Sequence, residues 1–478
     1  MKVLLVTDSA VLRRSVAQAA VDRGHDVRAL TRADDRPPTH WPARVEPWPA
    51  ALGDVNAVLE ASTGCDAAIL IDDRLARMGT PEGDPAAFTT KAVNALGDRG
   101  VRTLLALPRA LDERSEPAAN QPSSLRIRCD GVYGTGEDAV SVFLIMMRTL
   151  PAVPLLSATH PLRPLWHEDL ARGLAAAVAF ESPARTLDFT AAESTTYDAL
   201  YERLAALIDR RPVRLPIPDF VAAHGARLAD VLHLPVPFDA AMLGAPAPPA
   251  SVPDGLTLLG VERTGLELGL RRLATGLPEM VPSEGVGRLE VKRFFAEITA
   301  TPHTAPELLR LMRSRFGEVM PIPVGVEPVS PLTSLEPGAV ITMNLPARGH
   351  LQIRVVSVAE DHVAGVTLKG HALAGCVRFS AAPTARGIRF EVMTCESASN
   401  TFDWLTLCLG GGRLQDANWK SVVENVVKMS GGQAEKVQSD GRRLTSAEAE
   451  QADRWIRELV EAPAPAAPPL QEPKSAPH

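Results

Sequence analysis

The 478-residue sequence lacks several features that mark whole classes of protein. Its formal net charge of −7 gives no excess of cations to attract a nucleic-acid backbone or an anionic membrane surface. Its five cysteines form no Cys-x-x-Cys pair, and no basic region followed by a long apolar core stands at the N-terminus. We therefore expect a cytoplasmic protein in a reducing setting, with no nucleic-acid partner.

Long apolar runs are also missing. The longest clusters, "VFLIMM" at 142–147 and "LAAAVAF" at 174–180, fall well short of the roughly 20 residues that cross a bilayer. The sequence therefore predicts no membrane span.

Metal-binding and common catalytic motifs are absent as well. His350, His362 and His371 follow no metal-ligand spacing, and no cysteine or acidic residue completes a set. There is no P-loop and no Gly-x-Ser-x-Gly elbow. We predict no metal site.

What is present in the first half is an alternation of short apolar runs with helical patterns. The runs are "KVLLV", "DVRAL", "CDAAILI", "VRTLLAL" and "LRIRCDGVYG". Helices fit at 11–23 and 89–99, each followed by a glycine, Gly24 or Gly100, as helix ends commonly are. Strands that alternate with helices predict an α/β, doubly wound parallel Rossmann-like sheet, which we assign to residues 1–275.

The second half has a different character. Residues 276–287 read as a linker, and strand-like segments without intervening helices begin near residue 338. These indicate a smaller α+β domain with an antiparallel sheet at 288–432, then a helical extension at 433–461. The Pro/Ala-rich stretch 462–478 cannot bury apolar area and is expected to be disordered.

Several segments of the first half, in this order and spacing, carry a family resemblance. They are "MKVLLVT" with "RGHDVRALTR", "GCDAAILI", "VRTLLALP", "LRIRCDGVYGTGED", "PLWHEDLARGLAAAV" and "GLTLLGVERTGLELGLRRL". Together they resemble the atypical, extended short-chain dehydrogenase/reductases, the branch that holds NAD-dependent epimerase-like proteins and the non-catalytic complex I accessory subunit. The resemblance implies an NAD(P)-binding fold, a GxxGxxG turn and a catalytic Tyr-x-x-x-Lys pair.

The turn after the first strand departs from that pattern. A dinucleotide pyrophosphate needs free backbone N–H groups and closely approaching glycines at the first helix N-terminus. This chain has Thr7, Asp8 and Ser9 there, and its first glycine is Gly24. The Asp8 carboxylate would face the pyrophosphate, whereas Arg13 or Arg14 either pairs with phosphate or lies solvated on the helix. We keep Thr7, Asp8 and Ser9 as candidate cofactor-binding residues.

The proton relay of the family is missing too. None of the three tyrosines is followed four residues later by a lysine, and Lys91 is the only lysine between Lys2 and Lys292. The segment 109–125, where the catalytic helix would stand, is short and rich in Pro, Asn and Ser. We therefore expect no resident cofactor, with NADP or NAD as the group if the divergent site still binds one.

The remaining candidates each have a structural alternative. Arg28 and Arg32 end the second strand and suit either a 2′-phosphate or the protein surface. Tyr133, Asp138 and His167 are the catalytic candidates, from segments that resemble the family's substrate side. A backbone turn and a helix start explain the same segments.

The C-terminal domain resembles an uncharacterised bacterial and plant family. The resemblance rests on "AGVTLKGHALAGCVRFS", "GIRFEVMTCESAS" and "LGGGRLQDANWKSVVENVV". A curved antiparallel sheet around a helix encloses a small apolar ligand in some proteins and is filled by its own side chains in others. The sequence leaves both open.

Three hypotheses follow for function. In the first, a degenerate, non-catalytic dehydrogenase-like scaffold is fused to a sheet domain that binds a small molecule or a protein partner. In the second, the chain is an NAD(P)-dependent oxidoreductase or epimerase with a non-standard site. In the third, His371, Lys369 or Glu391 acts in a pocket of the sheet domain.

Overall fold

The computed structural model divides the chain into two compact units, between Leu277 and Pro278. It describes all residues except 32–40, 52, 76–84, 110–123, 156–160, 182–184, 217–253, 322–324, 327–334, 346–348, 407–411 and 462–478. The expected disordered tail therefore lies outside the described residues.

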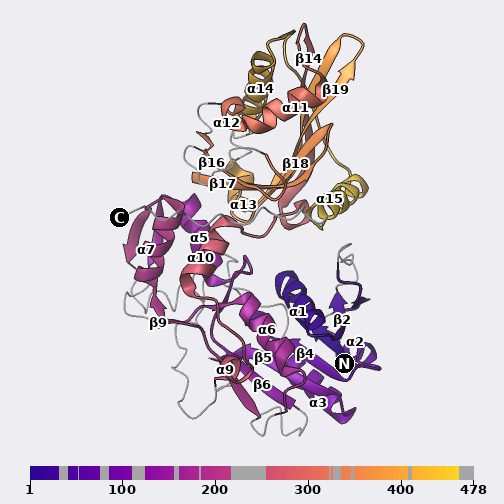
Figure 1. Ribbon diagram of the computed structural model, residues 1–478, viewed down its shortest axis with the longest axis vertical. Coiled ribbons are helices and arrows are strands. Elements are labelled where there is room, and N and C mark those ends of the chain that lie inside the picture. The colour runs from indigo at the N-terminus through magenta and orange to yellow at the C-terminus, as the bar shows by residue number, and fades with distance from the viewer. Residues whose placement is uncertain are drawn as a thin grey trace, which may run out of the picture. The chain divides into compact units, whose positions relative to one another are not determined.

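The first unit is built on a seven-stranded parallel sheet with the order β11-β6-β5-β4-β1-β2-β3 (Figure 1). Its strands are β1 Lys2–Val6, β2 Asp26–Thr31, β3 Val45–Pro49, β4 Ala67–Ile71, β5 Arg102–Pro108, β6 Ser124–Cys129 and β11 Thr186–Phe189. The order steps outward from β1 in both directions, as in the doubly wound dinucleotide-binding fold. The expected α/β, Rossmann-like class is confirmed.

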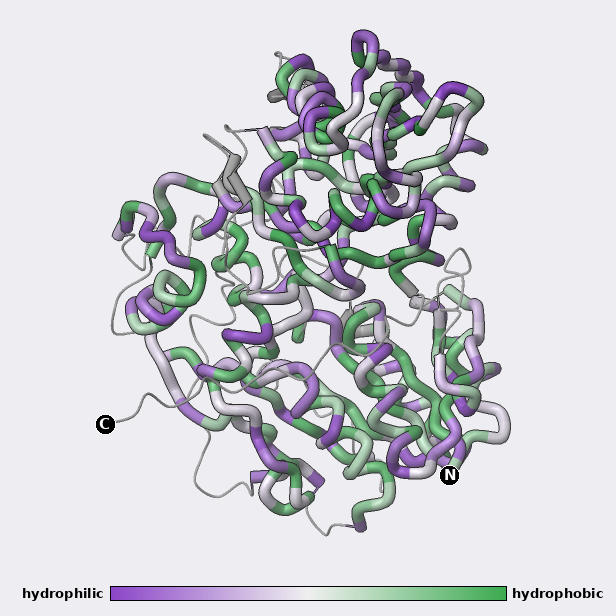
Figure 2. Tube along the Cα trace, turned by 45° about the horizontal axis from the view of Figure 1, so that its top comes forward, coloured by the Kyte–Doolittle hydropathy of each residue, from purple (hydrophilic) through white to green (hydrophobic). Residues whose placement is uncertain are grey.

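Helices cover both faces of this sheet. On one face, apolar residues of α1 (Ala10–Asp22) and α6 (His167–Ala177) share a core with the strands. On the other, α2 (Val55–Ala61) and α3 (Pro85–Asp98) do so. The strands are mostly apolar on both sides because both sides are covered. Figure 2 shows the hydropathy along the chain, with hydrophobic residues in green.

Further elements of the first unit extend beyond the large sheet. Three strand pairs, β7 with β10, β9 with β12 and β8 with β13, form small separate sheets. These strands are β7 Val132–Tyr133, β8 Ala152–Leu155, β9 Pro161–Leu162, β10 Leu165–Trp166, β12 Thr195–Thr196 and β13 Val213–Pro216. The helices are α5 Ala139–Thr149, α7 Tyr197–Ile208, α9 Gly255–Leu258 and α10 Leu266–Thr275.

The second unit is an antiparallel sheet of nine strands in the order β15-β16-β17-β18-β19-β20-β14-β21, with β22 also paired to β14. The strands are β14 Val286–Thr299, β15 Gly325–Val326, β16 Val340–Leu345, β17 Gly349–Val358, β18 His362–Thr367, β19 Leu373–Thr384, β20 Gly387–Ala398, β21 Gln433–Ala434 and β22 Gln438–Arg443. The expected α+β unit with an antiparallel sheet is confirmed.

Both faces of the second sheet are covered. One face packs against α11 (Ala305–Ser314), α12 (Phe316–Val319) and α14 (Gly412–Met429), with Phe294, Phe316, Phe379 and Phe390 fully buried between them. The other face holds α15 (Ser446–Glu461). The short helix α13 (Thr401–Thr406) contacts β20 and β14. The described side chains thus fill the sheet–helix interface on the α14 side.

The bounds of the second sheet differ from those expected. β14 starts at Val286, inside the stretch 276–287 that reads as a linker. Residues 433–461, expected as a helical extension, contain β21 and β22 before α15, and both strands pair with β14. Most of β22 consists of exposed polar residues, so its sequence lacks the apolar alternation that marks a half-buried strand.

Candidate functional site

The carboxyl ends of the parallel strands bring the sequence candidates of the first unit to one edge. The chain reverses its direction of winding between β1 and β4, and ligands of doubly wound sheets bind at the carboxyl edge of that switch point. Thr7, Asp8 and Ser9 follow β1, and Asp72 and Asp73 follow β4. This edge is the candidate site.

The first turn of α1 is capped by its own side chains. The Ser9 hydroxyl accepts a hydrogen bond from the Leu12 N–H at 3.3 Å, so Ser9 is the N-cap residue. The Ser9 N–H in turn donates to the Thr7 hydroxyl at 3.2 Å. These bonds start a helix without glycine because a capping serine satisfies amides that a phosphate satisfies in dinucleotide-binding proteins.

A carboxylate supplied by the protein lies against the same turn. Asp73 begins a short 3-10 helix after β4, and its Oδ1 accepts the Asp8 N–H at 2.9 Å and the Thr7 hydroxyl at 3.1 Å. Burial raises the pKa of Asp73, and the charge of Asp8 adds to the rise, whereas the Asp8 N–H and the Thr7 hydroxyl oppose it. The Asp73 carboxyl group is therefore an internal hydrogen-bond acceptor at the edge where a dinucleotide-binding sheet of this class receives a phosphate.

These residues do not fit a dinucleotide pyrophosphate. The Asp8 amide already donates to Asp73, and two carboxylates, those of Asp8 and Asp73, stand at the turn. A phosphate charge 4 Å from a carboxylate would be opposed by about 4 kcal/mol at an effective dielectric constant of about 20. A glycine-free turn also keeps strand, helix and phosphate from approaching closely.

The arginines near this edge are held inside the fold. Arg13 is buried, and its Nη2 donates to the Asp8 carbonyl at 3.3 Å, so it is not the solvated cation that we considered. Arg14 is exposed. Arg28, also buried, donates to Glu46 and to the carbonyls of Ala61 and Thr63. Its guanidinium stacks on Trp48, 4.6 Å from the ring centroid.

The contacts of Arg28 match neither of the two roles that the sequence suggests for it. They occupy its Nε and its Nη1, which donates twice, so Arg28 is neither a surface arginine nor directed at a cofactor phosphate. Arg32 lies outside the described residues.

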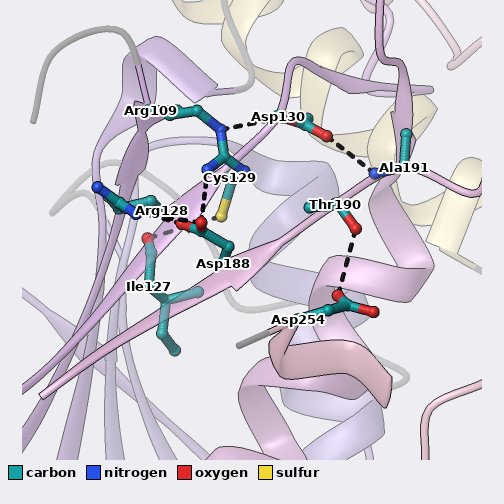
Figure 3. Close-up of polar contacts among 9 residues, drawn as sticks. All are labelled: Arg109, Ile127, Arg128, Cys129, Asp130, Asp188, Thr190, Ala191 and Asp254. Atoms are coloured by element: carbon teal, nitrogen blue, oxygen red, sulfur yellow. Dashed lines mark hydrogen bonds and ion pairs between the residues drawn. The ribbon is translucent and has the colours of Figure 1, made fainter. Parts of the chain in front are cut away.

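A buried ion network lies at the ends of β5, β6 and β11, which sequence reasoning missed (Figure 3). The Arg109 Nε contacts Asp130 at 3.2 Å, and its Nη1 contacts Asp188 at 2.8 Å. Arg128 adds a bidentate pair with Asp188, at 2.7 and 3.0 Å. The backbone N–H of Ala191 donates to Asp130 at 3.0 Å.

The network balances two guanidinium groups against two carboxylates. Burial raises the pKa of Asp130, although the Ala191 N–H and Arg109 oppose the rise. Burial also raises the pKa of the neighbouring Cys129 thiol, which makes that thiol a poor nucleophile. Each charged group thus has partners of opposite sign, and the arrangement stabilises the strand ends rather than presenting a reactive group.

The catalytic candidate Asp138 is fully engaged. It is the N-cap of α5, and its two carboxylate oxygens accept five hydrogen bonds from Gly134, Thr135 and Ser141, at 2.6–3.0 Å. Only 3% of Asp138 is exposed. The structure therefore places Asp138 as the acceptor that closes the loop between β7 and α5.

Tyr133 and His167 are buried side by side with Trp166. The Tyr133 and His167 rings lie 5.1 and 4.5 Å from the Trp166 ring. The His167 Nδ1 is 3.1 Å from the Ser15 hydroxyl, which ties α6 to α1, and burial lowers the pKa of His167. Burial raises the pKa of Tyr133, and its phenol abuts Gly269, where no side chain would fit.

Neither ring lies in a proton relay. Within the described part of the chain, the Tyr133 hydroxyl has no hydrogen-bond partner. Most of the stretch in which the family's catalytic helix would stand, residues 110–123, lies outside that part.

The comparisons with known proteins find similarity in solved structures. Neither a protein-family model nor a curated protein matches the sequence. A nucleoside-diphosphate-sugar epimerase from Staphylococcus aureus has a TM-score of 0.42 and 15% identity, covering 57% of this chain and 100% of its own. The triphenylmethane reductase of Citrobacter sp. has a TM-score of 0.42 and 14% identity, covering 57% and 99%.

A third similar structure is the UDP-glucose 4-epimerase of Thermus thermophilus in complex with NAD. It has a TM-score of 0.41 and 15% identity, covering 57% of this chain and 98% of its own. The assignment of the first unit to the doubly wound class rests on the strand order and pairing of its own sheet.

In the second unit, the structure does not bring the three sequence candidates together. Lys369 pairs with Glu284 at 3.3 Å, and the His371 ring accepts the Leu373 N–H in a turn. Glu391 bonds Arg389 at 2.9 Å on the sheet face opposite α14. Among the described residues of this unit, the buried acids are instead Glu396 and Asp403, which no motif marks.

Two further findings concern metal binding and membrane spans. Within the described ranges, no three His, Cys, Asp or Glu side chains are grouped so that they could hold a metal ion. Over the same ranges, no helix combines the length and the apolar character needed to cross a membrane.

Proposed function

We propose that the first unit is a non-catalytic, dehydrogenase-like module that binds a partner without a resident dinucleotide. The observation that carries the proposal is the contact of the Asp73 carboxylate with the Asp8 N–H and the Thr7 hydroxyl. An acceptor built into the chain occupies the amide of the turn that an external phosphate would need.

The acid–base side of the candidate site supports the same proposal. A general acid or base must reach a substrate proton with a suitable pKa. Asp138 already accepts five hydrogen bonds, the Tyr133 phenol is buried with its pKa raised, and His167 is bound to Ser15. Asp138 and His167 are therefore engaged in hydrogen bonds within the protein, and Tyr133 is buried with its proton held more tightly.

A binding role is the function that this arrangement leaves to the first unit. Its sheet edge is closed by bonds within the protein, as the network of Arg109, Arg128, Asp130 and Asp188 illustrates. The partner class that we propose is a small molecule or a protein, held on a rigid scaffold.

The test is a titration of the full chain with NADH and NADPH, followed by nicotinamide fluorescence and by the melting temperature. A cofactor present at 100 times its Kd stabilises the folded state by about 2.7 kcal/mol, which for a unit of this size raises the melting temperature by several degrees. We expect no shift at millimolar concentration of either cofactor.

Asp73→Asn provides the matched variant. Its amide oxygen still accepts the Asp8 N–H, but the charge is gone. If Asp73 alone excludes the cofactor, this variant gains affinity; if the glycine-free turn contributes as well, it does not. Micromolar binding of either cofactor by the wild-type chain would contradict the proposal and favour the alternative, an NAD(P)-dependent oxidoreductase or epimerase with a non-standard site.

A further inference from the structure

The strand register of the second unit places a buried carboxyl group under helix α14. Side chains of directly paired residues lie on the same face of a sheet. One row across β22, β14, β20 and β19 therefore holds Arg443, Glu290, Glu396 and Gly375. Only 8% of Glu396 is exposed, and the glycine beside it contributes no polar group.

The next rows show why this carboxyl is enclosed. Lys292 and Thr394 follow Glu396 on the same face, and Phe294, Val392 and Phe379 follow them. The aromatic row belongs to the apolar core under α14, where Trp419 packs on Phe379 with ring centroids 6.0 Å apart. Glu396 therefore lies at the polar end of a largely apolar interface.

Helix α14 meets this polar end with two side chains. The Gln415 Nε2 donates to the Glu396 Oε1 at 2.6 Å, and the Asp416 Oδ1 accepts the Lys292 ammonium at 2.9 Å. Residues 415 and 416 are in the first turns of α14, which begins at Gly412. Both contacts fasten the same end of the helix to β20 and β14.

The charged side chains around Glu396 have opposite effects on its carboxylate, and most of them are paired with one another. Lys292 attracts its carboxylate and Asp416 repels it, and these two are themselves paired. Glu290, beside it in the row, is paired with Arg443 at 2.8 Å. On α13, the Asp403 carboxylate accepts from Ser399 and Asn400. Because burial outweighs Lys292 and the hydrogen bonds of Gln415 and Thr394, the pKa of Glu396 is raised to about 7.

We propose that Glu396 is a proton-operated latch for the first turns of α14. While its carboxyl is neutral, Lys292 stays with Asp416; its ionised form keeps the hydrogen bond from Gln415 but draws the Lys292 ammonium away from Asp416 and loosens that contact of the helix. The Lys292 ammonium is paired with Asp416 and also attracts the Glu396 carboxylate, so it has a second carboxylate to turn to once Glu396 ionises. Protonation selects between them near neutral pH.

The test is hydrogen exchange of the full-length protein at pH 6 and pH 8, with labelling times scaled to the intrinsic exchange rates. The readout is the protection of residues 412–420. The pKa of Glu396 is about 7 in the folded state and ordinary once that end of the helix opens. The protection of residues 412–420 should therefore fall about tenfold between pH 6 and pH 8. In Glu396→Gln, which cannot ionise, we expect the protection to be the same at both pH values.

Two further variants complete the design. Glu391→Gln is the matched control, because Glu391 lies on the opposite face of the same strand, and it should keep the tenfold change. Asp416→Asn removes the carboxylate that Lys292 leaves when Glu396 ionises, so residues 412–420 should already be poorly protected at pH 6 and should change little by pH 8; this variant also serves if Glu396→Gln does not fold. A wild-type protection that is independent of pH, a Glu396→Gln variant that keeps the change, or a full tenfold change in Asp416→Asn would each overturn the latch.

Discussion

The two units bury carboxylates in contrasting ways. In the first, Asp188 is held by Arg109 and Arg128, and Asp130 by Arg109 and a backbone amide. In the second, Glu396 has an amide, a hydroxyl and a lysine that is already paired. The comparison shows that burial alone does not make a functional group. Asp188, which two guanidinium groups contact directly, acts as a structural anion, whereas Glu396, whose neighbouring cation Lys292 is paired with Asp416, can respond to pH.

The largest loss of stability is expected in the buried ion network of the first unit, where two guanidinium groups face two carboxylates. Asp188→Ala leaves Arg109 and Arg128 without their shared carboxylate in a buried position. Breaking a buried pair in this way costs about 3–5 kcal/mol. Urea unfolding of the full chain should show this loss in the transition of the first unit.

Asp198→Ala is the matched control for that change. Asp198 forms an exposed ion pair with Arg214, a contact whose loss costs about 1 kcal/mol or less. Equal losses in the two variants would remove the distinction between a balanced buried network and an ordinary surface pair.

A smaller loss is expected at the edge of β1 and β4. Asp73→Ala leaves the Asp8 N–H and the Thr7 hydroxyl without their acceptor, which costs about 1–3 kcal/mol. Asp73→Asn, which keeps an acceptor oxygen, should recover most of that stability. Thermal unfolding measures both. If Asp73→Ala is as stable as the wild type, Asp73 is not the internal acceptor that we describe.

The second unit should show the opposite dependence on pH from acid-labile proteins. The pKa of Glu396 is raised to about 7 in the folded state and is near 4.5 when unfolded, so the folded state binds the proton more tightly. Stability is therefore greatest below the unfolded pKa and is lost as the pH rises through 7. Between pH 6 and pH 8 the loss should be about 1.4 kcal/mol.

Denaturant unfolding of the second unit at the two pH values measures this loss, and Glu396→Gln should abolish it. An equal loss in wild type and variant would place the titrating group elsewhere.

The smallest effect is expected at the contact between α1 and α6. Ser15→Ala removes the hydroxyl that bonds the His167 ring, for a cost of about 0.5–1.5 kcal/mol. Thermal unfolding should show a shift of a few degrees or less. A loss as large as that of Asp188→Ala would mean that His167 does more than tie two helices together.

The sequence was sufficient for the architecture of the first unit, for a clear physical reason. Apolar runs such as 67–71, buried on both faces, and glycines after helices, such as Gly24 with a φ of +83°, are local signals. β22 could not be found in this way, because its residues are polar and exposed and only its pairing with β14 makes it a strand.

Only part of the candidate site could be predicted from the sequence. The missing glycines at Thr7–Ser9 are a local pattern, but the carboxyl group that accepts the Asp8 N–H comes from Asp73, 65 residues after Asp8. Likewise, Arg109, Asp130 and Asp188 meet only because β5, β6 and β11 are neighbours in the sheet. Polar residues directly after predicted parallel strands were the one signal that could have pointed to them.

The most direct test of the central claim is hydrogen exchange across residues 7–13 of the wild-type chain, with and without 1 mM NADPH or NADH. If Asp73 already occupies the amide at the start of α1, neither cofactor should change the exchange of this turn. Protection of residues 7–13 by either cofactor would show that a pyrophosphate displaces Asp73, and would contradict the account.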